Sequence, residues 1–438
     1  MAIDNKDKKV LKSSIEREQN EVACSAECEK IKGSKNLNVP HLRFPEFSGE
    51  WDSFKLVELG KFIGGGTPSS SNLSFWTGSI PWISSSDIKE DNINNISISR
   101  YITEDAIEKS ATKYCPAPVI LIVSRVGVGK VALSHTSLCT SQDFCNIIDI
   151  KCHPVFLSYN LLRTMKRKSR EVQGTSIKGI TSDELQKIRV FIPKNKDEQN
   201  KISNLLTLLD ERIATQNKII EDLKKLKCAI INEVFCSPEQ HEPKRRFEGS
   251  SVPLSTYKMK DFCFRITDKN RDNKCSQVLT IAAQYGLVDQ ESFFNKSVAS
   301  ENLTGYYILK KGDFAYNRSY SSGYAWGAVK RLNNYSKGVL STLYICFRVD
   351  ESVVNSDYLS YYFESTKWHK GVSDISGEGA RNHGLLNISV TDYFNTKHHF
   401  AVIAEQKRIA SMLNAITIKE QNAIELGKLY SKHNVSSI

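Results

Sequence analysis

Arginine side chains stand beside glycine-containing turns at two places in this sequence. Arg125 follows a run of apolar residues and precedes Gly127, and Arg318 stands in a similar position before Gly323. Glycine permits a tight turn between strands, which leaves the arginine at an exposed strand end. A guanidinium group can donate two parallel hydrogen bonds to the edge of guanine in the DNA major groove. Both arginines are therefore predicted to contact bases.

Hydroxyl, amide and aromatic side chains occupy further loops that match between the two halves of the chain. The matching loops carry Ser141 and Gln142 against Ser341 and Thr342, and Trp82 against Gln284 and Tyr285. A tryptophan or tyrosine can equally fill a core, and phosphate contacts outnumber base contacts in protein–DNA complexes. The full set of candidate DNA contacts is Thr67, Trp82, Ser84, Arg125, Ser141, Gln142, Lys166, Lys178, Gln284, Tyr285, Asn317, Arg318, Ser341, Thr342 and Arg381.

A basic cluster, Lys166-Arg-Lys-Ser-Arg170, ends a predicted amphipathic helix. One interpretation is a solvated helix end, because most runs of charge are simply exposed. The other is a contact with phosphate groups, which would add affinity without sequence preference. The sequence leaves both interpretations open.

The segments that resemble catalytic motifs each lack a residue or a setting that the chemistry requires. Ser124-Arg-Val-Gly-Val-Gly129-Lys130-Val131 resembles a phosphate-binding loop, but it lacks the first glycine and the hydroxyl residue that binds magnesium. Glu242-Pro-Lys244 has the spacing of a nuclease pair but lies in a proline-containing linker, and no Asn-Pro-Pro-Tyr or Asp-Pro-Pro-Tyr motif of a methyltransferase occurs. We expect a chain that is not an enzyme.

The cysteines and histidines show no spacing typical of a metal site. None of the 11 cysteines forms a C-x-x-C pair, which is the usual signature of structural zinc. The nine histidines are scattered, and His398-His399 pairs with no carboxylate motif. We therefore expect neither a metal nor a cofactor, and most cysteines should be small buried side chains.

Composition favours a polyanionic partner. The 438 residues carry a formal net charge of +11, and the excess lies in the two halves rather than in the acidic segment that joins them. A basic surface gains affinity for nucleic acid by releasing counterions from phosphates. No stretch reaches the roughly 20 apolar residues that span a bilayer, and the first residues lack the apolar core of a signal peptide. We expect a cytoplasmic protein.

The chain repeats itself with a long period. The segment from Pro40 to Phe44 returns as Pro243 to Phe247, with arginine and phenylalanine at its end both times. Glu198-Gln199 returns as Glu405-Gln406, each followed by a long helical pattern. A period of this length exceeds those of solenoid repeats, so it indicates a duplicated domain.

Each copy is expected to be rich in strands and to include one shorter helix. Short β-branched or apolar runs bounded by turn residues are typical of buried strands. The expected strands are 119–123 and 147–150 in the first copy and 313–316, 325–329 and 342–349 in the second, with helices near 157–168 and 356–368.

A long amphipathic helix should close each copy. Apolar residues recur in a heptad from Ile202 to Val234, and Gln216 and Lys227 alone interrupt the two apolar rows. The second helix has a weaker apolar row, which includes Glu420.

These patterns divide the chain into six parts. We expect a mobile tail over 1–38, a first strand-rich domain over 39–195, a central long helix over 196–236, a linker over 237–251, a second strand-rich domain over 252–399 and a C-terminal long helix over 400–432.

Several motifs together resemble the specificity subunits of type I restriction-modification systems. They are Asn38-Val-Pro-His-Leu-Arg-Phe-Pro45, Leu56-Val-Glu-Leu-Gly60, Gly66-Thr-Pro68, Phe75-Trp-Thr-Gly-Ser-Ile-Pro-Trp82, Thr140-Ser-Gln142, Gly174-Thr175, Ile192-Pro193, Glu198-Gln199 and Leu209-Asp210. Their order and spacing match from Asn38 to near Lys432. The second copy departs from the pattern, because Phe400-Ala-Val-Ile-Ala-Glu405 lacks the proline before the helix and Gly379-Ala-Arg-Asn replaces the glycine-threonine loop.

The resemblance implies an α+β fold with two tandem target recognition domains. Each is followed by a long helix, and the two helices pack as an antiparallel coiled coil with pseudo-twofold symmetry. It also implies a non-catalytic subunit that binds an asymmetric, bipartite double-stranded DNA site and recruits methyltransferase (modification) subunits and restriction subunits. The alternatives are a protein-binding coiled-coil scaffold and a nuclease or nucleotide hydrolase, and the broken motifs disfavour the latter.

Overall fold

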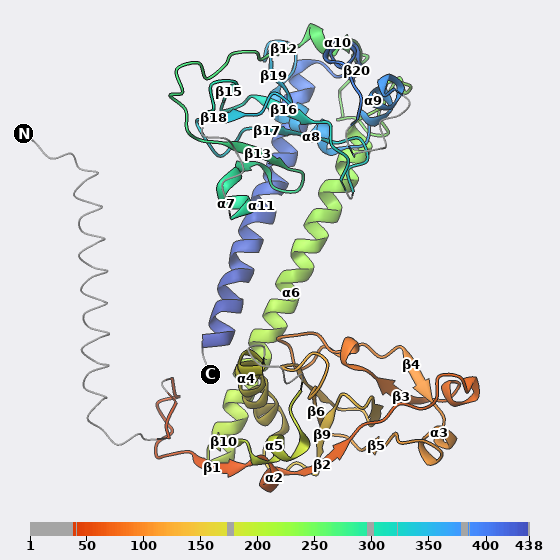
Figure 1. Cartoon of the computed structure of the whole chain (residues 1–438), viewed down its shortest axis with the longest axis vertical. Coiled ribbons are helices and arrows are strands. Elements are labelled where there is room, and N and C mark those ends of the chain that lie inside the picture. Colours follow the sequence, from red (N-terminus) through yellow and green to blue (C-terminus); the bar gives the residue numbers. More distant parts are fainter. Residues whose placement is uncertain are drawn as a thin grey trace, which may run out of the picture. The chain divides into compact units, whose positions relative to one another are not determined.

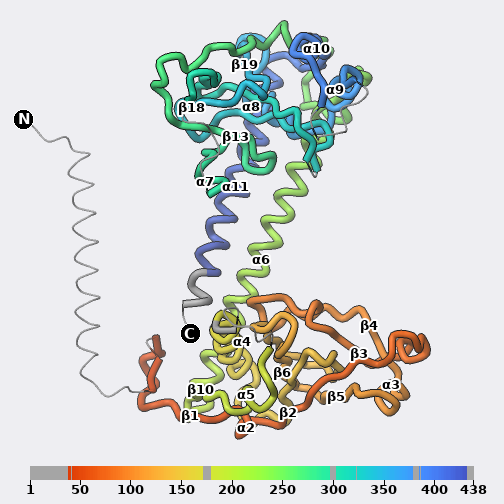
Figure 2. The backbone as a smooth tube through the Cα atoms, in the orientation of Figure 1, coloured from red at the N-terminus to blue at the C-terminus, as the bar shows by residue number. Residues whose placement is uncertain are grey.

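The computed structural model describes residues 38–40, 42–172, 179–295, 302–321, 323–377, 384 and 386–436. The chain divides into two compact units, with Met1–Ala214 and Lys428–Ile438 in unit 1 and Thr215–Gly427 in unit 2. Figure 1 labels many of the helices and strands of each unit, and Figure 2 traces the backbone. The expected tail, apart from Asn38, lies outside the described residues, as do Lys178 and Arg381.

Unit 1 is built on two four-stranded sheets and one ribbon. The first sheet has the order β2 (Lys61–Gly64), β9 (Cys145–Ile148), β6 (Val119–Ile122), β7 (Val131–Ser134), and the second has the order β4 (Arg100–Ile102), β3 (Ile80–Ile83), β8 (Leu138–Thr140), β5 (Tyr114–Cys115). The ribbon pairs β1 (Asp52–Lys55) with β10 (Arg189–Ile192). All pairs are antiparallel except β3 with β8.

One of the longer helices covers the first sheet of unit 1. The short helices are α2 (Leu56–Leu59), η1 (Leu73–Trp76), η2 (Ser85–Asp87), α3 (Glu104–Glu108) and α5 (Ser182–Lys187), and the longer ones are α4 (Pro154–Val172) and α6 (Lys196–Val234). One face of α4 places Leu157, Leu161 and Met165 in a cluster with Ile120 and Ile122 of β6. Burying this apolar face stabilises the unit and fixes α4 against the strands that carry the predicted loops.

Unit 2 repeats the first sheet of unit 1. Its four-stranded sheet has the order β12 (Cys263–Arg265), β19 (Ile345–Val349), β16 (Phe314–Asn317), β17 (Ala328–Arg331), all antiparallel. Three ribbons pair β11 (Ser255–Lys258) with β20 (Lys397–Phe400), β13 (Leu279–Ala282) with β14 (Gly286–Asp289) and β15 (Tyr307–Lys310) with β18 (Lys337–Leu340). The helices are η3 (Met259–Asp261), α7 (Gln290–Phe294), α8 (Ser356–Glu364), α9 (His369–Ile375), α10 (Val390–Asn395) and α11 (Ile403–Ser436).

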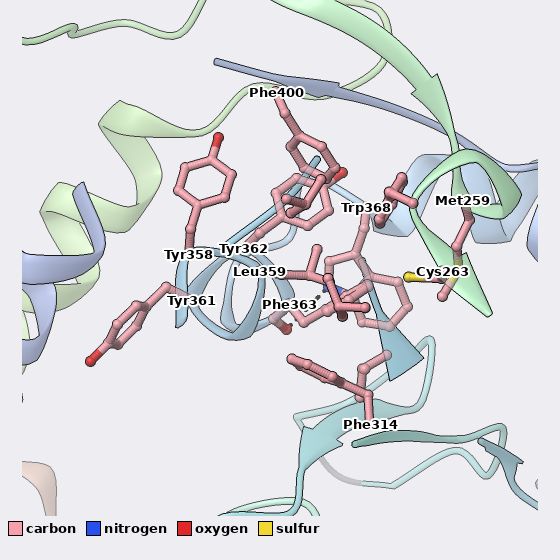
Figure 3. Packing of buried hydrophobic residues seen from close by; sticks show 14 of the residues in the cluster. Met259, Cys263, Phe314, Tyr358, Leu359, Tyr361, Tyr362, Phe363, Trp368 and Phe400 are labelled. Atoms are coloured by element: carbon pink, nitrogen blue, oxygen red, sulfur yellow. Dashed lines mark hydrogen bonds between the residues drawn. The ribbon is translucent and has the colours of Figure 1, made fainter. Parts of the chain in front are cut away.

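Aromatic side chains dominate the core of unit 2. Tyr362 and Phe363 of α8 pack with Trp368, Phe314 and Phe400, as Figure 3 shows. Most ring pairs meet edge to face, with Tyr362 and Phe400 centroids 5.2 Å apart, the arrangement that aromatic quadrupoles favour.

The expected strands are confirmed in type and order. Apolar β-branched runs give β6 and β9 in unit 1 and β16, β17 and β19 in unit 2, with ends that differ by a few residues from those expected. The expected helix over 356–368 instead stops at Glu364, and a separate α9 begins at His369. The duplicated domain is confirmed, because both units use the same sheet order.

The two interruptions of the heptad on α6 meet polar groups of α11 within unit 2. Gln216 Nε2 donates to the carbonyl of Ala423 at 2.9 Å, and Lys227 Nζ lies 3.2 Å from the Glu420 carboxylate. Residue numbers rise along α6 while they fall along α11 at these contacts, so the two helices run antiparallel here. Helix α11 forms without a proline before it, because proline is a favourable helix start and not a required one.

The repeated sequence motifs meet in space in each unit and form a strap, defined as Arg43-Phe44 in unit 1 and Arg246-Phe247 in unit 2. Arg43 donates through Nε and Nη2 to the two oxygens of Glu198, both at 2.7 Å. Arg246 binds Glu405 with the same two nitrogens, at 3.2 and 2.5 Å. The phenylalanine rings lie under cations one helical turn further along, Lys201 over Phe44 and Arg408 over Phe247. Each strap therefore ties the start of a copy to the helix that closes it.

Candidate nucleic-acid interface

A cleft in unit 1 brings together two of the predicted DNA contacts, Arg125 and Gln142. We call it the reading cleft, and it is lined by Gly64, Gly65, Ser124, Arg125, Val126, Gln142, Phe144, Cys145, Gly179, Ile180, Thr181 and Ser182. Four segments meet here: the end of β2, the turn after β6, the turn after β8 and the approach to α5. Arg125 and Gln142 are exposed, so both can reach a ligand outside the domain.

The glycines after β2 bring Thr67 to the same cleft. A Cβ on Gly65 would stand 2.0 Å from the carbonyl oxygen of Ser141, and one on Gly66 would stand 2.4 Å from the backbone of Ala111. Only glycine fits such close backbone contacts. As a result the Thr67 hydroxyl reaches Gln142 and donates to its Oε1. The structure thus places Thr67, Gln142 and Arg125 around one site.

The basic end of α4 borders the turn that carries Arg125. Gly127 and Gly129 both have positive φ, and a Cβ on Gly129 would lie 3.1 Å from Cβ of Ser169 in α4. Lys166 forms an exposed ion pair with Asp91, at 2.6 Å, while Arg167 and Arg170 are exposed. Cations and a hydrogen-bonding side chain therefore share one region of unit 1.

Trp82 and Ser141, which were predicted to contact DNA, are buried and do not line an open surface in this structure. Trp82 is 3% exposed, and its Nε1 donates to the carbonyl of Gly66 at 3.0 Å. Ser141 is also 3% exposed, with its hydroxyl directed to Asp143. A side chain needs an open path to the groove to reach a base edge. Both residues instead support the loops around the reading cleft.

Ser84 belongs to an internal network that the sequence did not predict. Its hydroxyl hydrogen-bonds with Asp87 and accepts from the guanidinium of Arg100, which also lies 4.5 Å above the Trp82 ring. Arg100 shows no local motif, so only the β3–β4 pairing places it beside Trp82. Because its hydroxyl is hydrogen-bonded within unit 1, Ser84 has a structural role in the β3–β4 region.

In unit 2 the turn after β18 repeats the turn after β8. The Tyr344 N–H donates to the Ser341 carbonyl at 3.2 Å, as the Phe144 N–H does to the Ser141 carbonyl at the same distance. The expected match of Ser341 with Ser141 is confirmed. Thr342 is exposed like Gln142, whereas the Ser341 hydroxyl accepts the Leu343 N–H.

The other candidates of unit 2 separate into exposed and engaged residues. Gln284 and Tyr285 are exposed on the β13–β14 hairpin, and the Tyr285 ring packs against Phe293. Asn317 accepts the Ser319 N–H at 2.9 Å. Arg318 donates from Nη1 to the Ile388 carbonyl and from Nη2 to the Leu343 carbonyl. Its guanidinium therefore holds backbone segments of its own unit. This differs from the expectation that Arg318 lies free at an exposed strand end.

One thiol lines the reading cleft. In the reading cleft, burial raises the pKa of the Cys145 thiol, which disfavours a nucleophilic thiolate. Within the described ranges, no three histidine, cysteine, aspartate or glutamate side chains gather as metal ligands. Over the same ranges, the helices include none with the length and apolar character to cross a membrane.

Comparisons with known proteins relate part of this chain to one protein family. Residues 48–225 match the family model of the type I restriction modification DNA specificity domain. The chain is 32% identical over 195 residues to the type I restriction enzyme MjaIX specificity subunit of Methanocaldococcus jannaschii, covering 42% of this chain and 44% of that protein. It is 34% identical over 192 residues to the EcoR124I/EcoR124II specificity subunit of Escherichia coli, covering 42% and 46%. The matched segment thus spans less than half of each relative.

A solved structure extends the likeness in fold. The crystal structure of a type I restriction-modification system S subunit from M. genitalium aligns with 91% of this chain and 98% of its own, with a TM-score of 0.54 and 14% identity. At this identity the comparison shows the shared fold alone.

Proposed function

We propose that the whole chain is the DNA-recognition subunit of a type I restriction-modification complex. The premise is the match of residues 48–225 to the type I restriction modification DNA specificity domain. The reading cleft is the observation that carries the proposal. The exposed Arg125 and Gln142 both line it, and arginine can recognise the guanine edge and glutamine the adenine edge in the major groove. Unit 1 would read one part of a bipartite site and unit 2 the other.

Phosphate contacts would orient the protein on the duplex. The basic end of α4 borders the Arg125 turn through the close approach of Gly129 to Ser169, so a duplex that enters the reading cleft can bring its backbone to Arg167 and Arg170. Such contacts add affinity and register without base preference. The net positive charge of the chain fits the same role.

The long helices would dock the modification subunits. Apolar side chains remain exposed along α6, with Leu205 and Leu208 in unit 1 and Ile219 and Leu226 in unit 2. On α11 of unit 2, Ile418 and Leu426 are exposed as well. Exposed apolar residues on helices of a charged protein favour a protein partner. Methyltransferase subunits would bind here and bring restriction subunits with them, and the chemistry would reside on those partners.

The central experiment is methylation mapping of a host genome with and without the gene for this chain. We expect one bipartite methylated motif to disappear when the chain is removed, because the modification subunit then has no guide to its target. The complex should lack this motif-specific methylation if Arg125 and Gln142 are both replaced by alanine. An unchanged set of methylated motifs after removal of the chain would contradict the proposed function.

Two rival functions give different results in binding and activity assays. A protein-binding scaffold would show no salt-dependent DNA binding in complex with the modification subunit, whereas a recognition subunit loses affinity steeply as salt rises. A nuclease or nucleotide hydrolase would turn over substrate as a purified chain, and we expect none. We place the subunit in the cytoplasm, where bacterial and archaeal DNA lies.

A further inference from the structure

Strand β6 of unit 1, which leads to Arg125 in the reading cleft, can be aligned residue by residue with β16 of unit 2. The identical hydrogen-bonded turns make Ser341 the counterpart of Ser141, which makes Phe347 of β19 the counterpart of Ile147 of β9. Ile147 pairs with Ile120 of β6, and Phe347 pairs with Phe314 of β16. Phe314 is therefore the counterpart of Ile120, and counting along the strands makes Arg318 the counterpart of Ser124.

Hydrogen bonds join corresponding segments in the two units. The Ser124 backbone N–H donates to the Asp143 carbonyl at 2.8 Å, whereas Arg318 reaches the carbonyl of Leu343, the counterpart of Asp143, with its side-chain Nη2 at 3.1 Å. The Ser124 carbonyl accepts from Ile180 just before α5, and the Arg318 carbonyl accepts from Leu386 just before α10. Ser124 and Arg318 thus hold the same two segments in their units.

The alignment changes which side chains face outward in unit 2. The counterpart of Val126, which is 70% exposed, is Tyr320, which is 61% exposed. The counterpart of Asp143 is Leu343, which is 64% exposed. Where unit 1 presents Arg125 and Gln142, the counterparts in unit 2 are the shorter Ser319 and Thr342. Unit 2 therefore exposes two apolar side chains, Tyr320 and Leu343, on two loops that Arg318 joins by its hydrogen bond to the Leu343 carbonyl.

We propose that unit 2 reads the 5-methyl group of thymine through Tyr320 and Leu343, with Arg318 as the positioning residue that fixes both loops. Thymine alone among the four bases carries a methyl group in the major groove, and apolar side chains recognise it by contact. Arg318 acts through its bonds to the carbonyls of Leu343 and Ile388, because loss of the guanidinium would remove the hydrogen bonds that hold both segments. The inference rests on the proposed function and adds the chemical group that the second half-site must contain.

The test replaces thymine by deoxyuridine, which removes only the methyl group. The assembled complex of the full chain with its modification subunits is bound to duplexes that carry its mapped site, with each half-site substituted in turn. The half-site of unit 1 is identified as the one whose base preferences Gln142→Ala alters. In the other half-site, deoxyuridine should weaken binding by roughly fourfold for each contacted methyl group. Deoxyuridine in the half-site of unit 1 should have a smaller effect.

Variants assign the effect to residues. Tyr320→Ala and Leu343→Ala should each bring the thymine-to-uracil binding ratio towards one, while Phe264→Ala, an exposed aromatic substitution on β12 of the same unit, should leave the ratio unchanged. Arg318→Ala should also abolish the ratio, and Arg318→Lys should restore part of it, because an ammonium group can reach one of the two carbonyls. The first half-site should be read normally by all of these variants.

Three results would overturn the inference while leaving the proposed function intact. They are a second half-site without thymine on either strand, equal binding of thymine and uracil by the unaltered complex, and an unchanged ratio in both the Tyr320 and Leu343 variants. Loss of all site-specific binding by the unaltered complex would instead contradict the proposed function itself.

Discussion

At the scale of single residues, base contacts and phosphate contacts in unit 1 should have separable effects. Arg125→Ala removes a group able to make two hydrogen bonds to one base, so we expect a loss of about 1–3 kcal/mol of discrimination at one position. Lys166→Ala removes a cation beside the same turn and should weaken specific and scrambled DNA alike. Competition binding at several salt concentrations measures both quantities.

The salt dependence provides the control for that comparison. Loss of one phosphate contact should reduce the slope of log affinity against log salt by about one, whereas Arg125→Ala should leave the slope nearly unchanged if it contacts only a base. The existing pair of Lys166 with Asp91 adds a second variant, Asp91→Asn, which should not weaken DNA binding. Equal effects of Arg125→Ala on cognate and scrambled DNA would refute its role as a base contact.

A buried histidine should make the stability of unit 2 depend on pH. His398 hydrogen-bonds with Tyr362 and Thr396 through its two ring nitrogens, and burial, with His399 nearby, lowers its pKa to about 3. In the unfolded chain the ordinary pKa near 6.5 applies, so below that pH the unfolded state binds the proton that the folded state excludes. The free energy of unfolding should fall by about 2 kcal/mol between pH 7 and pH 5 from this group.

Chemical denaturation followed by tryptophan fluorescence measures this effect, because Trp368 lies in the same core as His398. His398→Gln should be less stable at neutral pH, since it loses the fit of the ring, but its stability should change less between pH 7 and pH 5. A variant that loses stability as steeply as the unaltered chain over this range would show that other groups cause the pH dependence.

At the scale of secondary-structure elements, the two straps should contribute strongly to folding. Glu198 is 1% exposed and is bound by Arg43 and by Trp51 Nε1. Arg43→Ala leaves this carboxylate buried without its cation, which typically costs about 3–5 kcal/mol. Arg246→Ala should have a similar effect through Glu405 in unit 2. Thermal and chemical unfolding of the single variants measure these losses.

A double variant separates the contribution of the Arg43–Glu198 ion pair to the free energy of unfolding from the effects of the single substitutions. Arg43→Met with Glu198→Met removes both charges together and should cost clearly less than the sum of the two single substitutions, because no unpaired buried charge remains. Additive losses would indicate that the two residues stabilise unit 1 independently.

The contact between the long helices in unit 2 should behave as a charge pair. Lys227→Glu sets a second carboxylate against Glu420, and Glu420→Lys sets a second ammonium against Lys227, so each should destabilise the unit. Exchanging both charges should restore most of the loss, with a coupling energy of about 0.5–3 kcal/mol. A double-mutant cycle by urea denaturation measures it, and a coupling near zero would show that solvent screens this partly exposed pair.

The sequence predicted a helix or strand where a single pattern, either a continuous apolar run or a heptad, was enough to determine it. Runs such as Val119–Ile122 are apolar throughout because both faces are buried, and the heptad of α6 follows from its packing in rows. The short β13–β14 ribbon and the break between α8 and α9 follow from tertiary contacts. Trp368, for example, directly precedes α9, and its ring packs against Phe363 and Tyr316, which no local pattern of residues indicates.

The candidate site was harder to predict than the elements, and for a physical reason. Residue type shows which bonds a side chain can make, but only the packing shows whether it has already made them. Trp82 and Arg318 have suitable chemistry, yet one is buried under Arg100 and the other holds two backbone carbonyls. Arg125 and Gln142 are exposed in turns at the cleft, and their contact with DNA stays a prediction.

At the scale of the whole molecule, the duplication should produce a target with unlike halves. The two units share sheet order, straps and turn geometry, so both should approach DNA with the same loops. Those loops carry different chemistry, because Arg125 and Gln142 in unit 1 align with Ser319 and Thr342 in unit 2, and Asp143 aligns with the exposed Leu343. Hydrogen-bonding and apolar tips select different base edges. The methylated motif should therefore be bipartite and not palindromic.

Exchange of the tips between units tests this expectation most directly. Replacing Ser319 and Thr342 by arginine and glutamine, together with Leu343→Asp and Tyr320→Val, gives unit 2 the outward residues of unit 1 on a frame that Arg318 still holds. If the tips determine the readout, methylation mapping should show the second half-site shifting towards the sequence of the first, while the first stays unchanged. A palindromic motif in the unaltered host would contradict the expectation at once. An unchanged second half-site in the exchanged variant, with activity retained, would place base recognition on other loops, with the exposed Gln284 and Tyr285 of the β13–β14 hairpin as the next residues to exchange.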